Sequence, residues 1–165
     1  MIAWMLFVMG LASFSGPTAG APAQTPASLG RGVTMTPVDG WASAQDVWNV
    51  GPGAVSLRRA GVLAAFAADS YSGTAQRLLD RQLGDLKAQF GSFRSLPSAS
   101  TTIAEGVPAL KVLFSGTADS GDLEGELVAG TIGGTGVVML AVAPAGQVAQ
   151  AQSDLDAMLD SLVVP

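Results

Sequence analysis

The chain has 165 residues, 48% of them hydrophobic, which is the size and composition of one globular domain built around a single core. A formal net charge of −5, with only eight Lys and Arg residues, argues against nucleic-acid binding, because that requires clustered cations to neutralise phosphates. The chain has no Cys and no His, which excludes disulfides, Cys–His and Ser–His catalysis, and anchoring through a lipidated cysteine.

The N-terminal 15 residues are almost wholly apolar, and the first charged residue is Arg31. An apolar segment of this length is typical of a signal peptide and is shorter than the roughly 20 residues of a membrane-spanning helix. Residues 1–23 are predicted to be a signal peptide with an A-x-A cleavage motif, or a truncated membrane anchor, because no basic residue precedes the apolar run. Residues 24–31 are predicted to be a flexible linker, and both alternatives place the domain of residues 32–165 outside the cytoplasm.

The domain is predicted to open with short strands. Val33 and Met35 alternate with threonines, the period-two pattern of a half-buried strand, and Pro37 places the end of this strand at a sheet edge. Three more strands are predicted, over residues 47–50, 54–59 and 61–68. The last two are expected to pair through a turn near Ala60 and Gly61.

A helix is predicted next, over residues 74–90, with Ser72 or Thr74 as its N-cap. Its apolar residues recur at spacings of four, four, three and four, which is the stripe of an amphipathic helix. The stripe consists of Ala75, Leu79, Leu83, Leu86 and Phe90.

The second half of the domain is predicted to contain four strands and a closing helix. The strands cover residues 98–103, 110–115, 123–132 and 137–142, and the last three form a meander that turns at residues 116–121 and at Gly133-Gly134. An apolar face over residues 145–162 predicts the closing helix. This order of elements indicates an α+β domain in which an antiparallel sheet is flanked by helices.

Four segments carry a resemblance to a known family: residues 32–41, from the first strand to Gly40-Trp41; residues 86–90; residues 106–116; and residues 143–165. In this order and spacing the chain resembles the PsbP-like α/β/α sandwich family, and especially its exported actinobacterial LpqN-like branch. The family also includes photosystem II extrinsic proteins and a nuclear Ran-binding protein. The resemblance implies an antiparallel sheet flanked by helices and a role in binding and assembly without catalysis. The chain departs from the usual exported members by lacking a lipobox cysteine.

Two polar segments raise the question of a ligand. Residues 119–126 hold four carboxylates, and Glu124 and Glu126 share one strand face, an arrangement of oxygen ligands that Ca²⁺ can use. Their spacing does not match a calcium loop, so we interpret them as a polar hairpin tip and predict no metal and no cofactor. The glycine-rich residues 130–136 lack the Lys-Ser/Thr of a phosphate loop and join two strands, so we interpret them as a turn.

Four residues are candidates for binding: Trp41, Trp48, Arg58 and Arg59. The tryptophans either close the sheet as core residues or, if exposed, anchor a partner or an apolar ligand. The arginines either bind an anion or protect an edge strand with charge. Carboxylates are the only broad acid–base groups and no pair of them has a recognisable catalytic context, so the chain is predicted not to be an enzyme.

These observations lead to two hypotheses of function. The first is an exported, non-catalytic cell-envelope domain that binds another protein, through its sheet face or a rim near Trp48 and the two arginines. The alternative is a small-molecule or lipid-binding module with an apolar pocket between sheet and helix, lined by side chains such as Phe66, Leu79 and Met139. An exposed apolar patch over a closed core favours the first, and an enclosed cavity of several hundred cubic ångströms favours the second.

Overall fold

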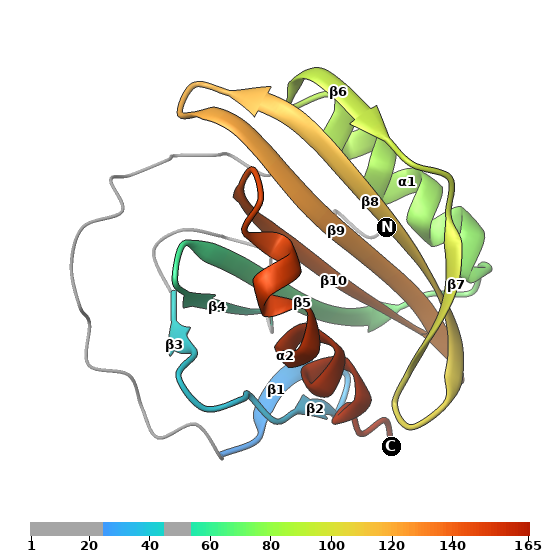
Figure 1. The fold of residues 1–165 in the computed structure, drawn as a ribbon. Helices are drawn as coiled ribbons and strands as arrows, with labels where there is room; N and C mark the ends of the chain where they lie inside the picture. Colours follow the sequence, from blue (N-terminus) through green and yellow to red (C-terminus); the bar gives the residue numbers. More distant parts are fainter. Residues whose placement is uncertain (1–24, 45–53) are drawn as a thin grey trace.

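The computed structural model describes residues 25–44 and 54–165, which form two sheets and two helices (Figure 1). The smaller sheet is a hairpin of β1 (Ala27–Gly30) and β2 (Val33–Met35). The strands of the larger sheet are β3 (Ala42–Ser43), β4 (Val55–Arg59), β5 (Val62–Ser70), β6 (Gly91–Ser95), β7 (Ala99–Ile103), β8 (Val107–Ala118), β9 (Gly121–Ile132) and β10 (Thr135–Pro144). The helices are α1 (Ala75–Lys87) and α2 (Val148–Asp160).

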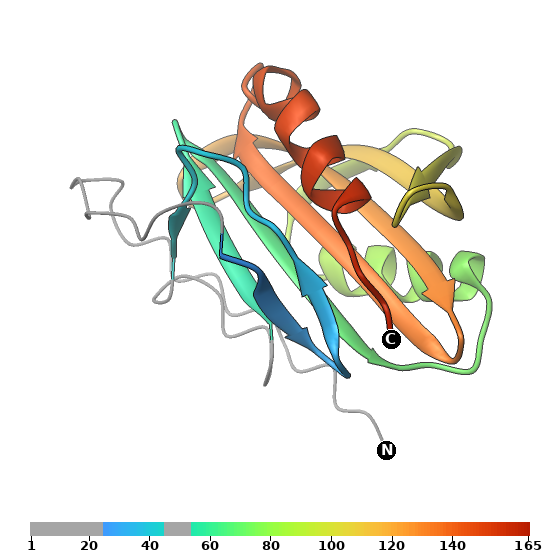
Figure 2. The same ribbon diagram turned by 90° about the horizontal axis from the view of Figure 1, so that it is seen from below.

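The larger sheet is antiparallel throughout its described pairings and follows the order β3-β4-β5-β10-β9-β8-β6. β7 also pairs with β8, so β6 and β7 follow one another along the same outer edge of that strand. Apolar side chains on both faces of the central strands require cover on both sides. α1 covers one face, and α2 with the β1–β2 hairpin covers the other (Figures 1 and 2). This confirms the predicted α+β fold with an antiparallel sheet flanked by helices.

Two tight turns set the register of the central strands. Ala60 and Gly61 join β4 to β5, with φ angles of 46° and 84°, and Gly133 and Gly134 join β9 to β10, with φ angles of 54° and 82°. Successive positive φ angles are what a two-residue hairpin turn requires when its twist matches that of the strands. Both turns were predicted from the sequence, and the meander of β8, β9 and β10 is confirmed.

α1 begins as the sequence predicts. The Thr74 hydroxyl accepts a hydrogen bond from the backbone N–H of Arg77 at 3.3 Å, which satisfies one of the amides that a helix N-terminus leaves unpaired. The helix buries Leu78, Leu79 and Leu86 against β8 and β9. Leu78 lies outside the predicted stripe, because the buried face of the helix is wider than the single stripe of apolar residues that the sequence indicates.

The opposite face has a second core, in which α2 packs beside the β1–β2 hairpin. Leu29 of β1 and Leu155 of α2 are both fully buried in this core. The chain end joins the hairpin, because Thr34 and Val163 exchange two backbone hydrogen bonds of 3.0 and 2.9 Å. Residues 27–30, which were predicted to belong to a flexible linker, form a strand that pairs with β2. The burial of Leu29 and the turn before Val33 account for the difference.

One strand of the structure was not predicted, and two predicted segments lie outside the described residues. β6 was not predicted, because its exposed and largely polar residues show no apolar alternation. The strand predicted over residues 47–50 lies outside the described residues, as do residues 1–24 with the predicted signal peptide or anchor. Within the part of the chain that the structure describes, neither helix has the length and apolar character needed to cross a membrane.

Candidate functional site

The predicted binding residues Trp41 and Arg59 meet on one side of α2. The Trp41 side chain is only 3% exposed, and its indole N–H donates a hydrogen bond to Asp154 Oδ2 at 3.0 Å. The Arg59 guanidinium forms an ion pair with the same carboxylate oxygen while remaining about half exposed. The core interpretation of Trp41 is thereby confirmed. Gly40, with a φ of 88°, lets the chain turn so that the indole lies in the α2-side core.

The other two predicted residues do not join this cluster. Arg58 pairs across β4 and β5 with Leu63, whereas Arg59 pairs with Val62, so the two arginines point to opposite faces of the sheet. Trp48 lies outside the described residues. A binding role for these residues stays a prediction, and Arg59 is the one that the structure places at the exposed border of α2.

The residues named for an apolar pocket do not line a common cavity. Phe66 and Met139 are buried in the core beneath α2, and Leu79 is buried in the core beneath α1, on the other side of the sheet. All three are fully buried among packed side chains. The apolar-pocket alternative therefore requires different residues from those predicted.

A more suitable site lies on the α2 side of the sheet, where α2 leaves the end of the β8–β9 hairpin uncovered (Figure 1). Two large apolar side chains are exposed near this uncovered end: Leu96, after β6, is 61% exposed, and Leu113 of β8 is 41% exposed. They are direct neighbours, because the Leu96 N–H donates a 2.9 Å hydrogen bond to the Leu113 carbonyl oxygen. Exposed apolar side chains placed side by side are typical of an interaction surface.

A pocket of about 150 Å³ opens beside these leucines, between β8, β9 and the first turns of α2. We refer to this pocket and the adjoining exposed leucine as the β8–α2 groove. Its residues are Leu96, Leu113, Phe114, Glu124, Gly125, Val148, Ala149 and Gln152.

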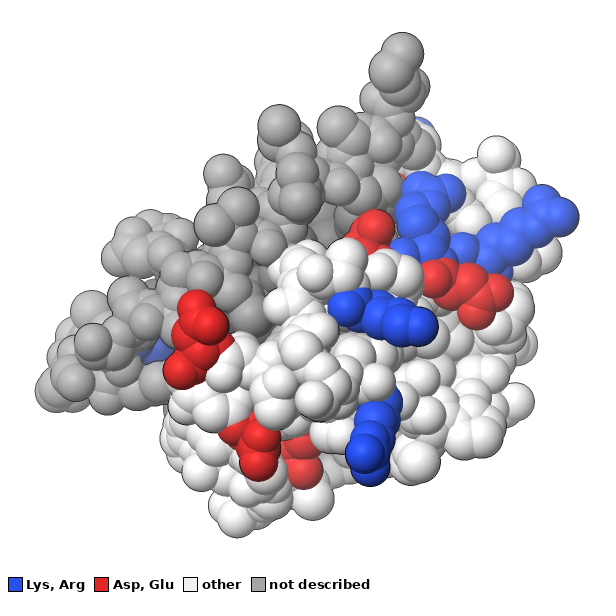
Figure 3. Space-filling model, turned by 90° about the horizontal axis from the view of Figure 1, so that it is seen from above, with Lys and Arg blue, Asp and Glu red and all other residues white. Residues whose placement is uncertain are grey.

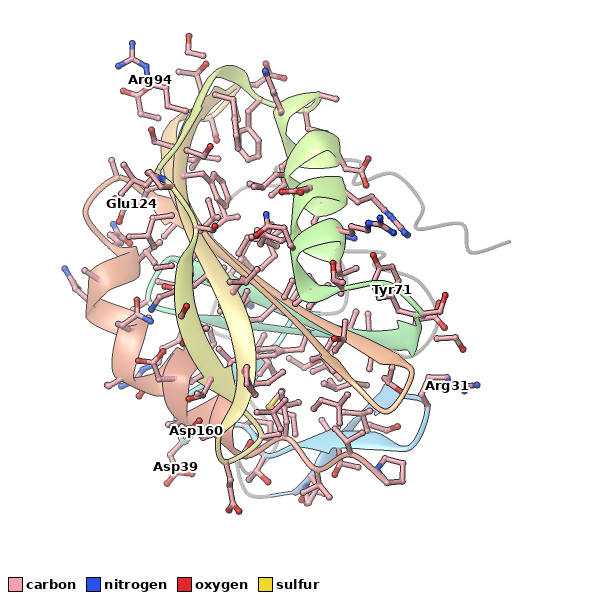
Figure 4. All side chains as sticks on the ribbon, turned by 90° about the vertical axis from the view of Figure 1, so that its right-hand side faces the viewer. Arg31, Asp39, Tyr71, Arg94, Glu124 and Asp160 are labelled. Atoms are coloured by element: carbon pink, nitrogen blue, oxygen red, sulfur yellow. The ribbon has the colours of Figure 1, made fainter. Side chains whose placement is uncertain are left out.

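Glu124 holds the start of α2 at one end of the groove. α2 has Gln147 at its N-cap position, and this side chain makes no capping hydrogen bond. Glu124 Oε1 instead accepts a 2.9 Å hydrogen bond from the backbone N–H of Val148. A carboxylate is suited to this place, because the unpaired amides and the helix dipole give a helix N-terminus positive character. Figure 4 shows Glu124 on the α2 side of the sheet, with Arg94 farther out on β6.

Glu126 lies one step further along the same face of β9 and is fully buried. Its Oε1 accepts a 3.3 Å hydrogen bond from the Gln152 amide, and the Lys111 ammonium lies 3.9 Å from the same oxygen. Burial raises the pKa of the Glu126 carboxyl, and the nearby positive charge of Lys111 opposes this rise. Its Oε2 is buried without a hydrogen-bond partner among the described residues.

The four carboxylates predicted to form a hairpin tip are divided between two environments. Asp119 and Asp122 are exposed, whereas Glu124 and Glu126 are held by α2. Over residues 25–44 and 54–165, no group of three or more acidic side chains is placed to hold a metal ion. Acidic and basic side chains are interspersed on the face shown in Figure 3.

Part of this site was predictable from the sequence. Glu124 and Glu126 were predicted to share one face of a strand, and the structure confirms this alternation. Leu113, Ala149 and Gln152 were not predicted as site residues, because their exposure depends on where α2 crosses the sheet. The period-two pattern marks Leu113 as a strand residue but does not show which end of the face remains uncovered.

Comparisons with known proteins find similarity in structure but not in sequence. No protein-family model matches the chain, and no curated protein matches it. The structure of cyanobacterial PsbP (CyanoP) from Synechocystis matches with a TM-score of 0.61 and 14% identity, over 94% of this chain and 99% of that one. The Saccharomyces cerevisiae Ran-binding protein Mog1p matches with a TM-score of 0.57 and 12% identity, over 87% of this chain and 96% of that one.

The structure of LpqN, involved in cell envelope biogenesis of Mycobacterium tuberculosis, matches with a TM-score of 0.51 and 14% identity, over 86% of this chain and 90% of that one. A Bacteroides thetaiotaomicron structure matches over 81% of this chain, which spans only 45% of that protein. The chain thus has the PsbP-like fold, shared with PsbP, Mog1p and LpqN, and the resemblance predicted from the sequence is confirmed for the fold.

Proposed function

We propose that the chain is a non-catalytic domain that acts outside the cytoplasm, at the cell envelope, and binds another protein through the β8–α2 groove. The observation that carries this proposal is the pair of exposed leucines, Leu96 and Leu113, beside a pocket on the part of the sheet face that α2 leaves uncovered. An apolar patch of this kind with a polar border is the usual form of a protein-binding surface.

The chemistry of the groove supports binding more than catalysis. Glu126 is fully buried and accepts from Gln152, and one of the two oxygens of Glu124 is bound to the start of α2. A general acid or base must instead reach the reacting group of a substrate directly or through a water molecule. A binding role is also described for one protein of similar fold, the Ran-binding protein Mog1p.

The cell-envelope location has two lines of support. The apolar N-terminal segment has the length of a signal-peptide core and is followed by small residues that suit cleavage. LpqN, which has a similar fold, is described as involved in cell envelope biogenesis. Residues 1–23 would act as a signal peptide or an anchor, and the anchor would keep the domain near the membrane.

The alternative, binding of a lipid or a small molecule, is less well supported by the size of the pocket. A volume of about 150 Å³ is below the roughly 300–1,000 Å³ typical of ligand pockets. It is closer to the volume of one amino-acid side chain. Arg59, about half exposed at the other border of α2, remains a candidate for a second contact with a protein partner.

The test is chemical crosslinking of the native protein in its own cell-envelope fraction, followed by mass spectrometry of the products. We expect a reproducible protein neighbour with crosslinks to the β8–β9 hairpin or the start of α2. A co-purifying lipid without any protein neighbour would support the alternative. Recovery of the protein only from the cytoplasmic fraction would contradict the proposed location.

A further inference from the structure

The lining of the pocket in the β8–α2 groove combines apolar and polar residues. Leu113, Val148 and Ala149 are apolar, whereas Glu124 and Gln152 have side-chain oxygen atoms that can accept hydrogen bonds. One oxygen of Glu124 accepts from the Val148 N–H, which leaves the second oxygen available to a ligand. The Gln152 side-chain nitrogen donates both to Glu126 and to Asp156, so the Gln152 amide oxygen is left as an acceptor.

The charges around the groove favour a cationic occupant. Asp122, Glu124 and Glu126 occupy alternate positions of β9 and therefore share the face that α2 covers in part. Asp156 of α2 lies beside Gln152 on the same border. Two basic side chains share this face: Lys111, 3.9 Å from Glu126, and Arg94 of β6, which lies in register with Glu124 across Ser115. The four acidic groups outnumber these two basic groups and the partial positive charge of the α2 N-terminus.

The volume of the pocket limits the occupant further. About 150 Å³ accommodates one long side chain but not a folded peptide or a lipid chain with its headgroup. The side chains of Lys and Arg have an aliphatic stem that packs on apolar surface and a charged end that needs polar partners. This division matches a lining that includes both apolar residues and residues with hydrogen-bond acceptors.

We infer that the pocket receives a single Lys or Arg side chain from the protein partner, with its stem against Leu113, Val148 and Ala149 and its cationic end on Glu124 and Gln152. The inference rests on the proposed function, because it specifies which group of the partner enters the groove. The exposed Leu96 would then contact an apolar neighbour of that basic residue.

Titration of the full chain by nuclear magnetic resonance with three small probes tests the inference. The probes are the N-acetyl methylamides of lysine, norleucine and glutamate, of which norleucine has the stem of lysine without its ammonium group. We expect lysine to shift the backbone amides of Ala149 and Gln152 and to bind about fivefold more tightly than norleucine, with glutamate weakest. The backbone amide of Leu79, in α1 on the opposite face of the sheet, serves as the unperturbed reference.

The matched variant is Glu124→Gln, whose amide oxygen still accepts from the Val148 N–H but whose charge is gone. We expect the preference for lysine over norleucine to fall well below fivefold in this variant, because only the neutral Gln152 acceptor remains, and we expect norleucine to bind it as it binds the wild type. Norleucine binding as tightly as lysine in the wild type, an undiminished lysine preference in Glu124→Gln, or no shift with any probe would each overturn the inference. The crosslinking experiment tests the proposed function separately. If a protein partner is crosslinked at the groove but places no basic side chain in the pocket, the proposed function holds and this inference is wrong.

Discussion

The hydrogen bond between Glu124 and the first turn of α2 is predicted to stabilise the fold. Replacing Glu124 with alanine leaves the Val148 N–H without its partner, at a helix whose N-cap residue makes no capping bond of its own. Loss of a capping bond costs about 1 kcal/mol, and loss of a negative charge at a helix N-terminus about 0.5 kcal/mol. Glu124→Ala should therefore lower the free energy of unfolding by about 1.5 kcal/mol, or the melting temperature by roughly 5 °C.

Two variants separate the parts of this effect. Glu124→Gln keeps the acceptor and removes the charge, so its loss should be about 0.5 kcal/mol. Asp122→Ala removes an exposed carboxylate from the same face of β9 and should change stability by less than about 0.5 kcal/mol. Urea unfolding followed by circular dichroism measures all three. The reasoning is refuted if Glu124→Ala is as stable as the wild type, or if Glu124→Gln loses as much as Glu124→Ala.

Other predictions concern packing and pH. A Cβ at Gly125 would meet the Phe114 ring and lie 2.7 Å from the Ala141 carbonyl oxygen, so Gly125→Ala should lower the free energy of unfolding by about 2–3 kcal/mol. Gly84 lies in α1, and a Cβ there would meet no atom within 4 Å, so Gly84→Ala should raise the free energy of unfolding by about 1 kcal/mol. Similar results for both glycines in urea unfolding would contradict this assignment. Burial raises the pKa of Glu126 above its ordinary 4.5, so the folded state holds this proton more tightly than the unfolded chain, and wild-type stability is lost as pH rises above 4.5 through the folded pKa. Glu126→Gln cannot ionise, so its stability relative to the wild type should increase as the pH rises above 4.5. If urea unfolding gives the same difference between the two proteins at every pH, the burial of this charge has no such effect.

Features that depend on adjacent residues were predictable from the sequence. The turns at Ala60-Gly61 and Gly133-Gly134 follow from the preference of glycine for positive φ, and the Thr74 cap follows from the reach of a short hydroxyl side chain to a nearby amide. The two helices follow from the spacing of their apolar residues. Each of these features is determined within a few residues of the chain.

Features that depend on distant pairing were not predictable in this way. β1 and β6 are short strands whose existence depends on a partner strand, because their own residues show little apolar alternation. The same holds for the candidate site. The hydrogen bonds from α2 to Glu124 and Glu126 span 24 and 26 residues, and the Trp41–Asp154 bond spans 113. Sequence periodicity assigns such residues to a face but does not identify what they contact across it.

Site-specific photocrosslinking tests the central claim, that the partner binds at the β8–α2 groove, most directly. A photoreactive amino acid is placed at Leu113, in the groove, or at Arg77, exposed on α1 over the opposite face, and the protein is irradiated in its native cells. We predict one reproducible crosslinked protein with the probe at Leu113 and none with the probe at Arg77. Crosslinking of that protein from Arg77 and not from Leu113 would contradict the account.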